Sequence, residues 1–149
     1  MPELSELLDN AHMLLFIGVG NVLKCDDGVG VVISRQIRER PDILSLTVEV
    51  SIENYIGKIN SMKPGAIVIL DCMELGSDPG TYRIISLDHV EDMTFNTHNI
   101  SLSRVGDFFR FPSYVLGVQP LCINFGDELS PPVQHTAHRI ISQINQQKN

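Results

Sequence analysis

The chain has 149 residues, with eleven Lys and Arg against eighteen Asp and Glu, and its formal net charge is −7. This length suits one domain spanning residues 1–149, and the acidic balance argues against binding to nucleic-acid phosphates. Three widely spaced cysteines without a Cys-x-x-Cys pair exclude a disulfide framework and a cysteine-rich zinc module, and they predict buried or half-buried thiols. The first ten residues are too acidic for a secretory signal, and no apolar run approaches the roughly 20 residues that span a bilayer. We therefore expect a cytoplasmic protein without membrane insertion.

Apolar runs alternate with amphipathic stretches over the first half of the chain. Residues 13–18 form a short apolar run ended by glycines, which predicts a buried strand. Apolar residues recur four apart over 28–40, which predicts a helix with arginine near its end. A strand over 46–50 and a short helix over 54–62 follow, and 66–70 is apolar at every position. Strands as apolar as this last one need cover on both faces, which helices provide.

The second half of the chain continues the alternation. Residues 81–86 alternate like an edge strand, 98–110 suit a helix with one apolar side, and 113–118 form a last strand. The clearest helical pattern is C-terminal, where one stripe contains Val133, Ala137, Ile140, Ile141 and Ile144. The order β-α-β-α-β-β-α-β-α predicts an α/β fold, a three-layer α/β/α sandwich with a mostly parallel sheet.

Ligands of such sheets bind outside the carboxyl ends of the strands, so the loops over 18–28, 71–80 and 119–130 are where we expect the chemistry. The first loop resembles a dinucleotide-binding turn, but Leu23 stands where G-x-G-x-x-G requires its third glycine. Glu49 lies inside the predicted second strand, so no acidic residue is expected at the end of that strand. A Gly-Lys-Ser/Thr phosphate loop is also missing. These features argue against a nucleotide-dependent enzyme.

Three acidic positions and one histidine are the candidate site residues. Asp26 and Asp27 precede a predicted helix, where helix capping explains one carboxylate better than two. Asp71 ends the most buried strand, where an acidic residue is often a ligand or a catalytic group, a loop cap being the alternative. His98 begins a predicted helix after a polar segment. Carboxylates and an imidazole on one rim would suit a divalent metal ion.

The glycine-rich loop also carries a resemblance to a known family. The segment Phe16-Ile-Gly-Val-Gly-Asn-x-Leu-x-x-Asp-Asp-Gly-Val-Gly30 resembles the N-terminal signature of the hydrogenase maturation endopeptidases. The similarity continues in order through Ile69-Leu70-Asp71, Pro79-Gly80-Thr-Tyr-Arg-Ile-Ile85, Thr97-His98-Asn99-Ile-Ser-Leu102 and Leu116-Gly-Val-Gln-Pro120. The last two segments are most similar to the hydrogenase-3-type branch, which serves membrane-associated, energy-converting or formate-linked hydrogenases.

This resemblance implies a fold, an activity and a set of site residues. The implied fold is the phosphorylase/hydrolase-like sandwich, whose five-stranded sheet has one antiparallel strand. The implied activity is an aspartyl-type endopeptidase that removes the C-terminal extension of a [NiFe] hydrogenase large-subunit precursor after nickel insertion. Catalytic and metal-contacting roles fall on Asp27, Asp71 and His98, which would reach nickel carried by the precursor. Three such ligands leave coordination positions open, so we expect the free enzyme to hold no tightly bound metal.

One segment departs from the family pattern. Relatives often carry Asp-Gly-Gly after the second strand, whereas this chain reads Val48-Glu49-Val50-Ser51 and Glu49 is the nearest acid. Any role transferred to Glu49 stays open. The departure favours an alternative function, a non-catalytic chaperone of the same fold that binds nickel or the precursor.

Overall fold

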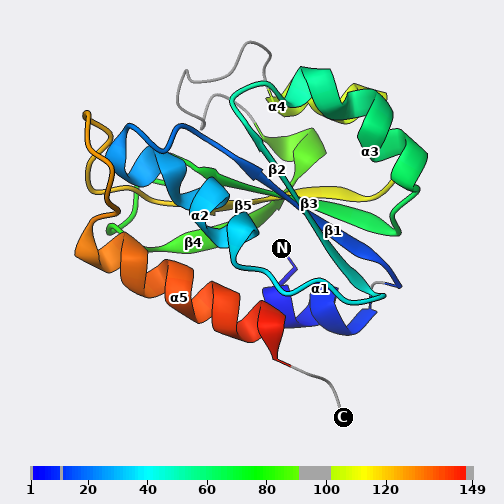
Figure 1. Cartoon of the computed structure of the whole chain (residues 1–149), viewed down its shortest axis with the longest axis horizontal. Coiled ribbons are helices and arrows are strands. Elements are labelled where there is room, and N and C mark those ends of the chain that lie inside the picture. Colours follow the sequence, from blue (N-terminus) through cyan, green and yellow to red (C-terminus); the bar gives the residue numbers. More distant parts are fainter. Residues whose placement is uncertain (1, 11, 91–101, 147–149) are drawn as a thin grey trace.

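A five-stranded sheet forms the middle layer of the computed structural model, which describes residues 2–10, 12–90 and 102–146 (Figure 1). Its strand order is β2-β1-β3-β5-β4. The strands are β1 (Leu14–Val19), β2 (Ile43–Glu49), β3 (Ala66–Cys72), β4 (Tyr82–Ser86) and β5 (Ser113–Val118). The pairs β1–β2, β1–β3 and β3–β5 are parallel, and β4 runs antiparallel to β5. The predicted mostly parallel sheet with one antiparallel strand is therefore confirmed.

Helices cover both faces of this sheet because its strands are apolar on both sides. The face packed on α1 (Leu4–Asn10), α2 (Val29–Arg35) and α5 (Pro131–Asn145) contains Phe16, Val68 and Leu116. The opposite face packs on α3 (Ile56–Met62) and α4 (Leu102–Val105), and contains Ile17, Ile69 and Val115. Short 3-10 turns complete the list: η1 (Cys25–Gly28), η2 (Ile52–Tyr55), η3 (Leu87–His89) and η4 (Gly106–Phe108).

The helices differ from the predictions at three places. The sequence pattern predicts no helix where α1 lies, and the structure buries Leu4, Leu7 and Leu8 in this helix of only seven residues. The helix predicted over 28–40 ends at Arg35, because the following backbone bonds instead to the end of α5, where the Arg38 N–H donates to Asn145 at 2.7 Å. The helix predicted over 98–110 is the single turn α4 followed by η4, and its first four positions lie outside the described residues.

The strand order reverses between β1 and β3, which makes this position the topological switch point of the sheet. The chain leaves β1 through α2 on one face to reach β2, and it returns from β2 to β3 through α3 on the other face. A crevice at the carboxyl ends of these two central strands is where ligands bind in open α/β sheets. Within the described residues, no helix is long and apolar enough to cross a membrane.

Candidate functional site

Asp27 and Asp71 lie at the same edge of the sheet, beside the switch point. Asp71 is the second-to-last residue of β3, and Asp27 lies in η1 directly before α2; each residue is 1% exposed. The start of α2 packs directly on the strand ends, since a Cβ at Gly30 would overlap the carbonyl oxygen of Leu70. The structure therefore places both predicted carboxylates at the carboxyl edge of the sheet.

Backbone N–H groups help to hold both carboxylates in place. Asp27 Oδ2 accepts a hydrogen bond from the Asn21 N–H at 3.0 Å, which closes the loop after β1. Asp71 Oδ1 accepts one from the Cys72 N–H at 2.8 Å. Gly20 has φ 134° and faces the carbonyl oxygen of Asp27 so closely that any side chain there would collide with it. The glycines of the first loop thus allow the carboxylates to approach the sheet.

The negative charges of these carboxylates act on the thiol of Cys72, the residue after Asp71. Burial raises the pKa of the Cys72 thiol far above its ordinary value, and the negative charges of Asp71, Asp27 and Asp26 raise it further. Because the thiolate is the nucleophilic form of cysteine, Cys72 is an inert, protonated thiol. Its side chain is buried, as the sequence predicts.

Asp26 has a structural role that the sequence does not reveal. Its Oδ2 accepts hydrogen bonds from the N–H groups of Leu121 and Cys122, at 2.8 and 3.1 Å, and from the Ser130 hydroxyl at 2.7 Å. Its Oδ1 accepts the Ser130 N–H at 2.7 Å. Asp26 therefore fastens the loop between β5 and α5 to the loop that carries Asp27. Helix capping, the alternative for these adjacent acids, therefore does not describe Asp26.

Gln119 joins the remaining loop to this edge. Its side chain is 6% exposed, accepts the Leu75 N–H at 2.6 Å and donates to Glu74 Oε2 at 3.1 Å. The loop after β3 is thereby tied to the end of β5. Gln119 belongs to the Gly-Val-Gln-Pro segment of the family resemblance, and these contacts show its physical role.

The expected position of Glu49 inside its strand was wrong. Glu49 is the last residue of β2, where the register with β1 is irregular and φ is 59°. Its exposed carboxylate pairs with Arg35 at 3.0 Å. An acidic residue therefore does end β2, although the glycine spacing still argues against a dinucleotide site. Whether Glu49 replaces the acid of the Asp-Gly-Gly segment stays a prediction.

His98, the third predicted site residue, lies outside the described residues. The helix α4 begins four positions after it in the sequence, and Leu102 of α4 packs on the face of the sheet that contains Ile69. Residue alternation along β3 places Asp71 on this same face. Over 2–10, 12–90 and 102–146, no group of three or more His, Cys, Asp or Glu side chains is arranged to hold a metal ion.

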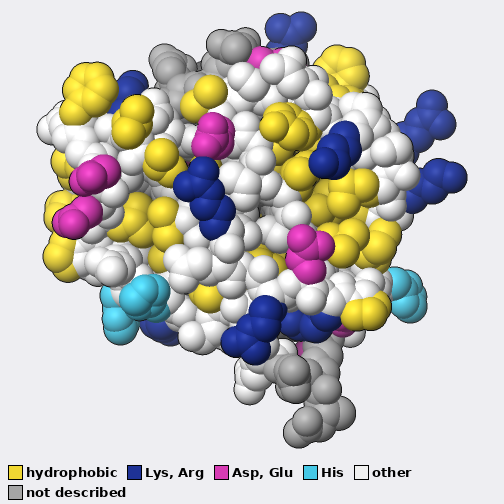
Figure 2. Space-filling view, viewed as in Figure 1, with side chains coloured by type: hydrophobic (Ala, Val, Ile, Leu, Met, Phe, Trp, Pro, Cys, Tyr) yellow, Lys and Arg dark blue, Asp and Glu magenta, His cyan; other side chains and the backbone are white. Residues whose placement is uncertain are grey.

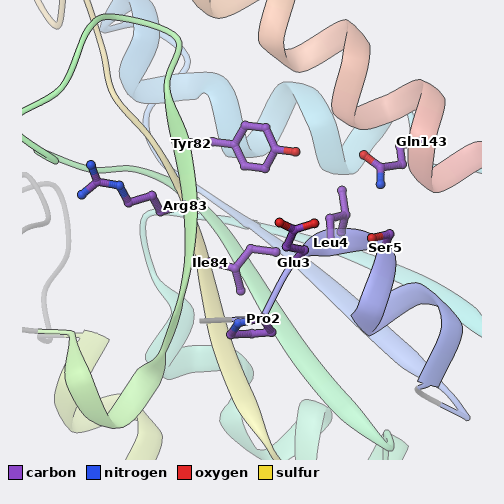
Figure 3. A pocket seen from close by; sticks show the side chains of 8 residues that line it. All are labelled: Pro2, Glu3, Leu4, Ser5, Tyr82, Arg83, Ile84 and Gln143. Atoms are coloured by element: carbon purple, nitrogen blue, oxygen red, sulfur yellow. The ribbon is translucent and has the colours of Figure 1, made fainter.

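A pocket of about 350 Å³ lies elsewhere, between the N-terminal segment, β4 and α5 (Figure 3). Its centre faces Tyr82 and Ile84, whereas the side chain of Arg83 points away. The pocket contains none of the predicted site residues; its lining consists of Pro2, Glu3, Leu4, Ser5, Tyr82, Arg83, Ile84 and Gln143. It is therefore separate from the carboxylate edge.

Comparison with known proteins gives a consistent assignment. A hydrogenase 3 maturation protease of Escherichia coli is 26% identical over 132 residues, which cover 85% of each chain. A Methanocaldococcus jannaschii protein, provisionally named a hydrogenase maturation protease, is 28% identical over 136 residues, 82% of this chain and 80% of the relative. The fold matches the crystal structure of the [NiFe] hydrogenase maturation protease HycI from Thermococcus kodakarensis, with a TM-score of 0.83, 23% identity and coverage of 95% and 96%.

The family assignment rests on the sequence model of the hydrogenase maturation protease (HycI) family, which matches residues 50–147. This segment contains β3, β4, β5 and α5, and with them Asp71 and Gln119. The glycine-rich loop and Asp27 precede it and supply the other side of the switch point. The chain belongs to the hydrogenase maturation protease family and is a peptidase.

Proposed function

We propose that this protein removes the C-terminal extension of a [NiFe] hydrogenase large-subunit precursor after nickel insertion, and that it recognises nickel held by the precursor. Membership of the maturation protease family supports the reaction class. The observation that supports the proposal is the burial of Asp27 and Asp71 at the carboxyl edge of the sheet, in the segments that follow β1 and end β3. The proposal places the protein in the cytoplasm and in the hydrogenase-3-type branch.

In this mechanism, Asp27, Asp71 and His98 contact the nickel of the bound precursor. The ion would polarise the scissile carbonyl as a Lewis acid. A site carboxylate takes a proton from the water that adds to this carbonyl and returns it to the departing amine. Burial of the carboxylates supports this role, because a low local dielectric strengthens their attraction to a cation. A cysteine nucleophile at Cys72 is disfavoured by its raised pKa.

The test compares nickel-loaded and nickel-free precursor, with the products identified by mass spectrometry. We expect shortening of the nickel-loaded precursor alone. Asp27→Asn and Asp71→Asn should abolish shortening, whereas Asp107→Asn, at an exposed position before β5, should retain it. Equal cleavage of both precursors would contradict nickel recognition.

The chaperone alternative has its own outcome in this experiment. It is favoured by the departure from the Asp-Gly-Gly pattern, since the nearest acid, Glu49, is paired with Arg35. A chaperone would bind the nickel-loaded precursor without shortening it. Binding without cleavage by the wild-type protein would therefore replace the peptidase proposal with this one.

A further inference from the structure

Two cysteines that lie 97 positions apart in the sequence meet beside the carboxylate edge. The Sγ atoms of Cys25 and Cys122 are 3.4 Å apart, and the Cys122 thiol donates to the Cys25 sulfur. Both thiols are half-buried and reduced. Two backbone hydrogen bonds hold the two segments side by side. The Cys25 N–H donates to the Gly126 carbonyl at 2.8 Å, and the Asp26 N–H donates to the Cys122 carbonyl at 3.0 Å. The pairing of these segments therefore does not depend on the thiols.

The surroundings allow the two sulfurs to come closer. A disulfide requires sulfurs about 2.05 Å apart, so the present distance must shorten by roughly 1.3 Å, within the range of side-chain rotation. Gly126 leaves room for this contact, since a Cβ there would lie 2.6 Å from Cys25 Sγ. The four hydrogen bonds of Asp26 keep both segments in place during the reaction.

We propose that Cys25 and Cys122 form a redox modification site, which a small-molecule disulfide such as oxidised glutathione converts to an intramolecular disulfide. One cysteine thiolate attacks the glutathione disulfide, whose S–S bond breaks and releases the first glutathione. The second cysteine attacks the resulting mixed disulfide and releases the second glutathione. The cysteine pair loses two electrons to the oxidant, and its two protons end on the released glutathione thiols.

The new bond would staple the loop that carries Asp27 to the loop between β5 and α5. Cross-linking positions so far apart removes conformational entropy from the unfolded chain. We therefore expect the oxidised protein to unfold several degrees above the reduced protein. This expectation does not depend on the proposed peptidase activity.

The test treats the full chain with oxidised glutathione and then measures intact mass and free thiols after denaturation. We expect a mass loss of roughly 2 Da, a fall from three free thiols to one, and a cross-linked peptide pair containing Cys25 and Cys122. Cys25→Ser should instead stop at a glutathione adduct on Cys122. Three remaining thiols, a lasting glutathione adduct on the wild-type protein, or a cross-link to Cys72 would each overturn the proposal.

A different observation, the exposure of apolar side chains, points to a docking surface on the same two loops. Leu23 and Leu121 are each 60% exposed, Ile123 is 37% exposed and Phe125 is 87% exposed. We call these four residues the apolar patch. In Figure 1 the loop after β5 (orange) stands out beside the start of α2, and Figure 2 shows hydrophobic side chains gathered on that side with acidic ones among them.

We infer that the apolar patch binds an apolar segment of the precursor protein that is flanked by basic residues; this inference rests on the proposed function. The patch is continuous with the site, because the Leu121 N–H donates to Asp26, the neighbour of Asp27, at 2.8 Å. Asp127 and Glu128, both exposed, follow Phe125 closely and favour positive charge on the partner. Substrate bound at the carboxylate edge would therefore extend over this patch.

The test measures steady-state cleavage of nickel-loaded precursor by patch variants. Phe125→Ser and Leu121→Ser should raise KM about tenfold with little change in kcat, because they remove binding contacts outside the reacting atoms. Phe108→Ser is the matched control. Phe108 is also exposed, at 52%, but it precedes β5 and therefore lies near the amino ends of the strands, away from the carboxylate edge. An unchanged KM in both patch variants would overturn the inference.

A second measurement separates this inference from the proposed function. If the wild-type protein cleaves no precursor, the peptidase proposal fails, and calorimetric binding of the precursor still tests the patch. Weaker binding by Phe125→Ser than by Phe108→Ser would then support docking. Equal binding by the two variants would contradict it.

Discussion

Asp26 and Asp27 are adjacent in the sequence but have different surroundings. Asp26 accepts four hydrogen bonds from a loop about a hundred positions away, whereas Asp27 accepts the Asn21 N–H within its own loop. Hydrogen bonds to a buried carboxylate are stronger than neutral ones, and leaving their donors without a partner is costly. We therefore assign a stabilising role in the fold to Asp26 and propose a catalytic role for Asp27.

The first prediction is that Asp26→Ala lowers the free energy of unfolding by about 2–4 kcal/mol, because it leaves three N–H donors and one hydroxyl without their acceptor. Urea unfolding measures this change. Asp107→Ala, at an exposed position, is the control and should stay within about 0.5 kcal/mol of the wild type. A loss below about 1 kcal/mol in Asp26→Ala would contradict the assigned role.

A second prediction concerns His98, whose role follows from the family resemblance. His98→Ala should abolish precursor processing while the melting temperature changes little, since an imidazole that acts on substrate contributes little to the core. Mass spectrometry of the precursor and thermal unfolding of the variant provide the two readouts. Normal processing would exclude the role, and a large fall in melting temperature would instead indicate a structural histidine.

The third prediction is a loss of stability at alkaline pH that depends on Cys72. Burial raises the pKa of this thiol in the folded protein, whereas the unfolded chain releases the proton near pH 9. Above that pH the unfolded state binds fewer protons, so the free energy of unfolding falls as pH rises, by up to about 1.4 kcal/mol per unit. Urea unfolding between pH 8 and 10.5 should show a steeper decline for the wild type than for Cys72→Ala. Parallel declines would show that Cys72 ionises equally in both states.

At the scale of elements, the contact between α2 and the sheet depends on glycine. A Cβ at Gly30 would overlap the Leu70 carbonyl oxygen and lie 2.6 Å from that of Val19, and both obstacles are backbone. Gly30→Ala should therefore destabilise the protein by about 3 kcal/mol or more and displace Asp27. Gly57→Ala in α3 is the control: nothing lies within 4 Å of its Cβ, and the helix should gain up to about 1 kcal/mol. Denaturant titration measures the free energy of unfolding of both variants, which should fall in Gly30→Ala and stay equal or rise in Gly57→Ala.

The strands could be predicted more closely than the helices. Buried strands such as β1 and β3 begin as continuous apolar runs, and a carboxylate at the end of such a run, Asp71, stands out in the sequence. The helix ends depend on contacts between distant segments, such as the bond from Arg38 to Asn145, which local periodicity does not contain. The pairing of Cys25 with Cys122 is of the same long-range kind.

At the scale of the whole molecule, three loops from separate parts of the chain meet at one edge of the sheet. Asp26 joins the first loop to the third, and Gln119 joins the second loop to the end of β5. Parallel strands bring these loops to the same side, beside the switch point between β1 and β3, where open α/β sheets bind their ligands. A single substrate can therefore meet carboxylates and the apolar patch at the same time.

The last prediction follows from this arrangement: nickel arrives with the precursor, and the isolated protein holds no metal tightly. Two carboxylates and one imidazole would leave an open coordination shell, whereas a permanent structural site closes its shell with four protein ligands. Soft thiolates in the precursor would hold nickel more strongly than such an oxygen-rich set. Metal analysis of protein purified without added metal should therefore find far less than one ion per chain.

Chelator treatment provides the matching control. Protein treated with chelator and then freed of it should cleave nickel-loaded precursor at the untreated rate, because the ion that the reaction needs enters with the substrate. Processing would then wait for nickel insertion, since a precursor without nickel presents nothing for Asp27 and Asp71 to contact. Stoichiometric metal in the isolated protein, or activity that is lost with chelator and restored by adding metal to the enzyme, would instead identify a resident metal ion.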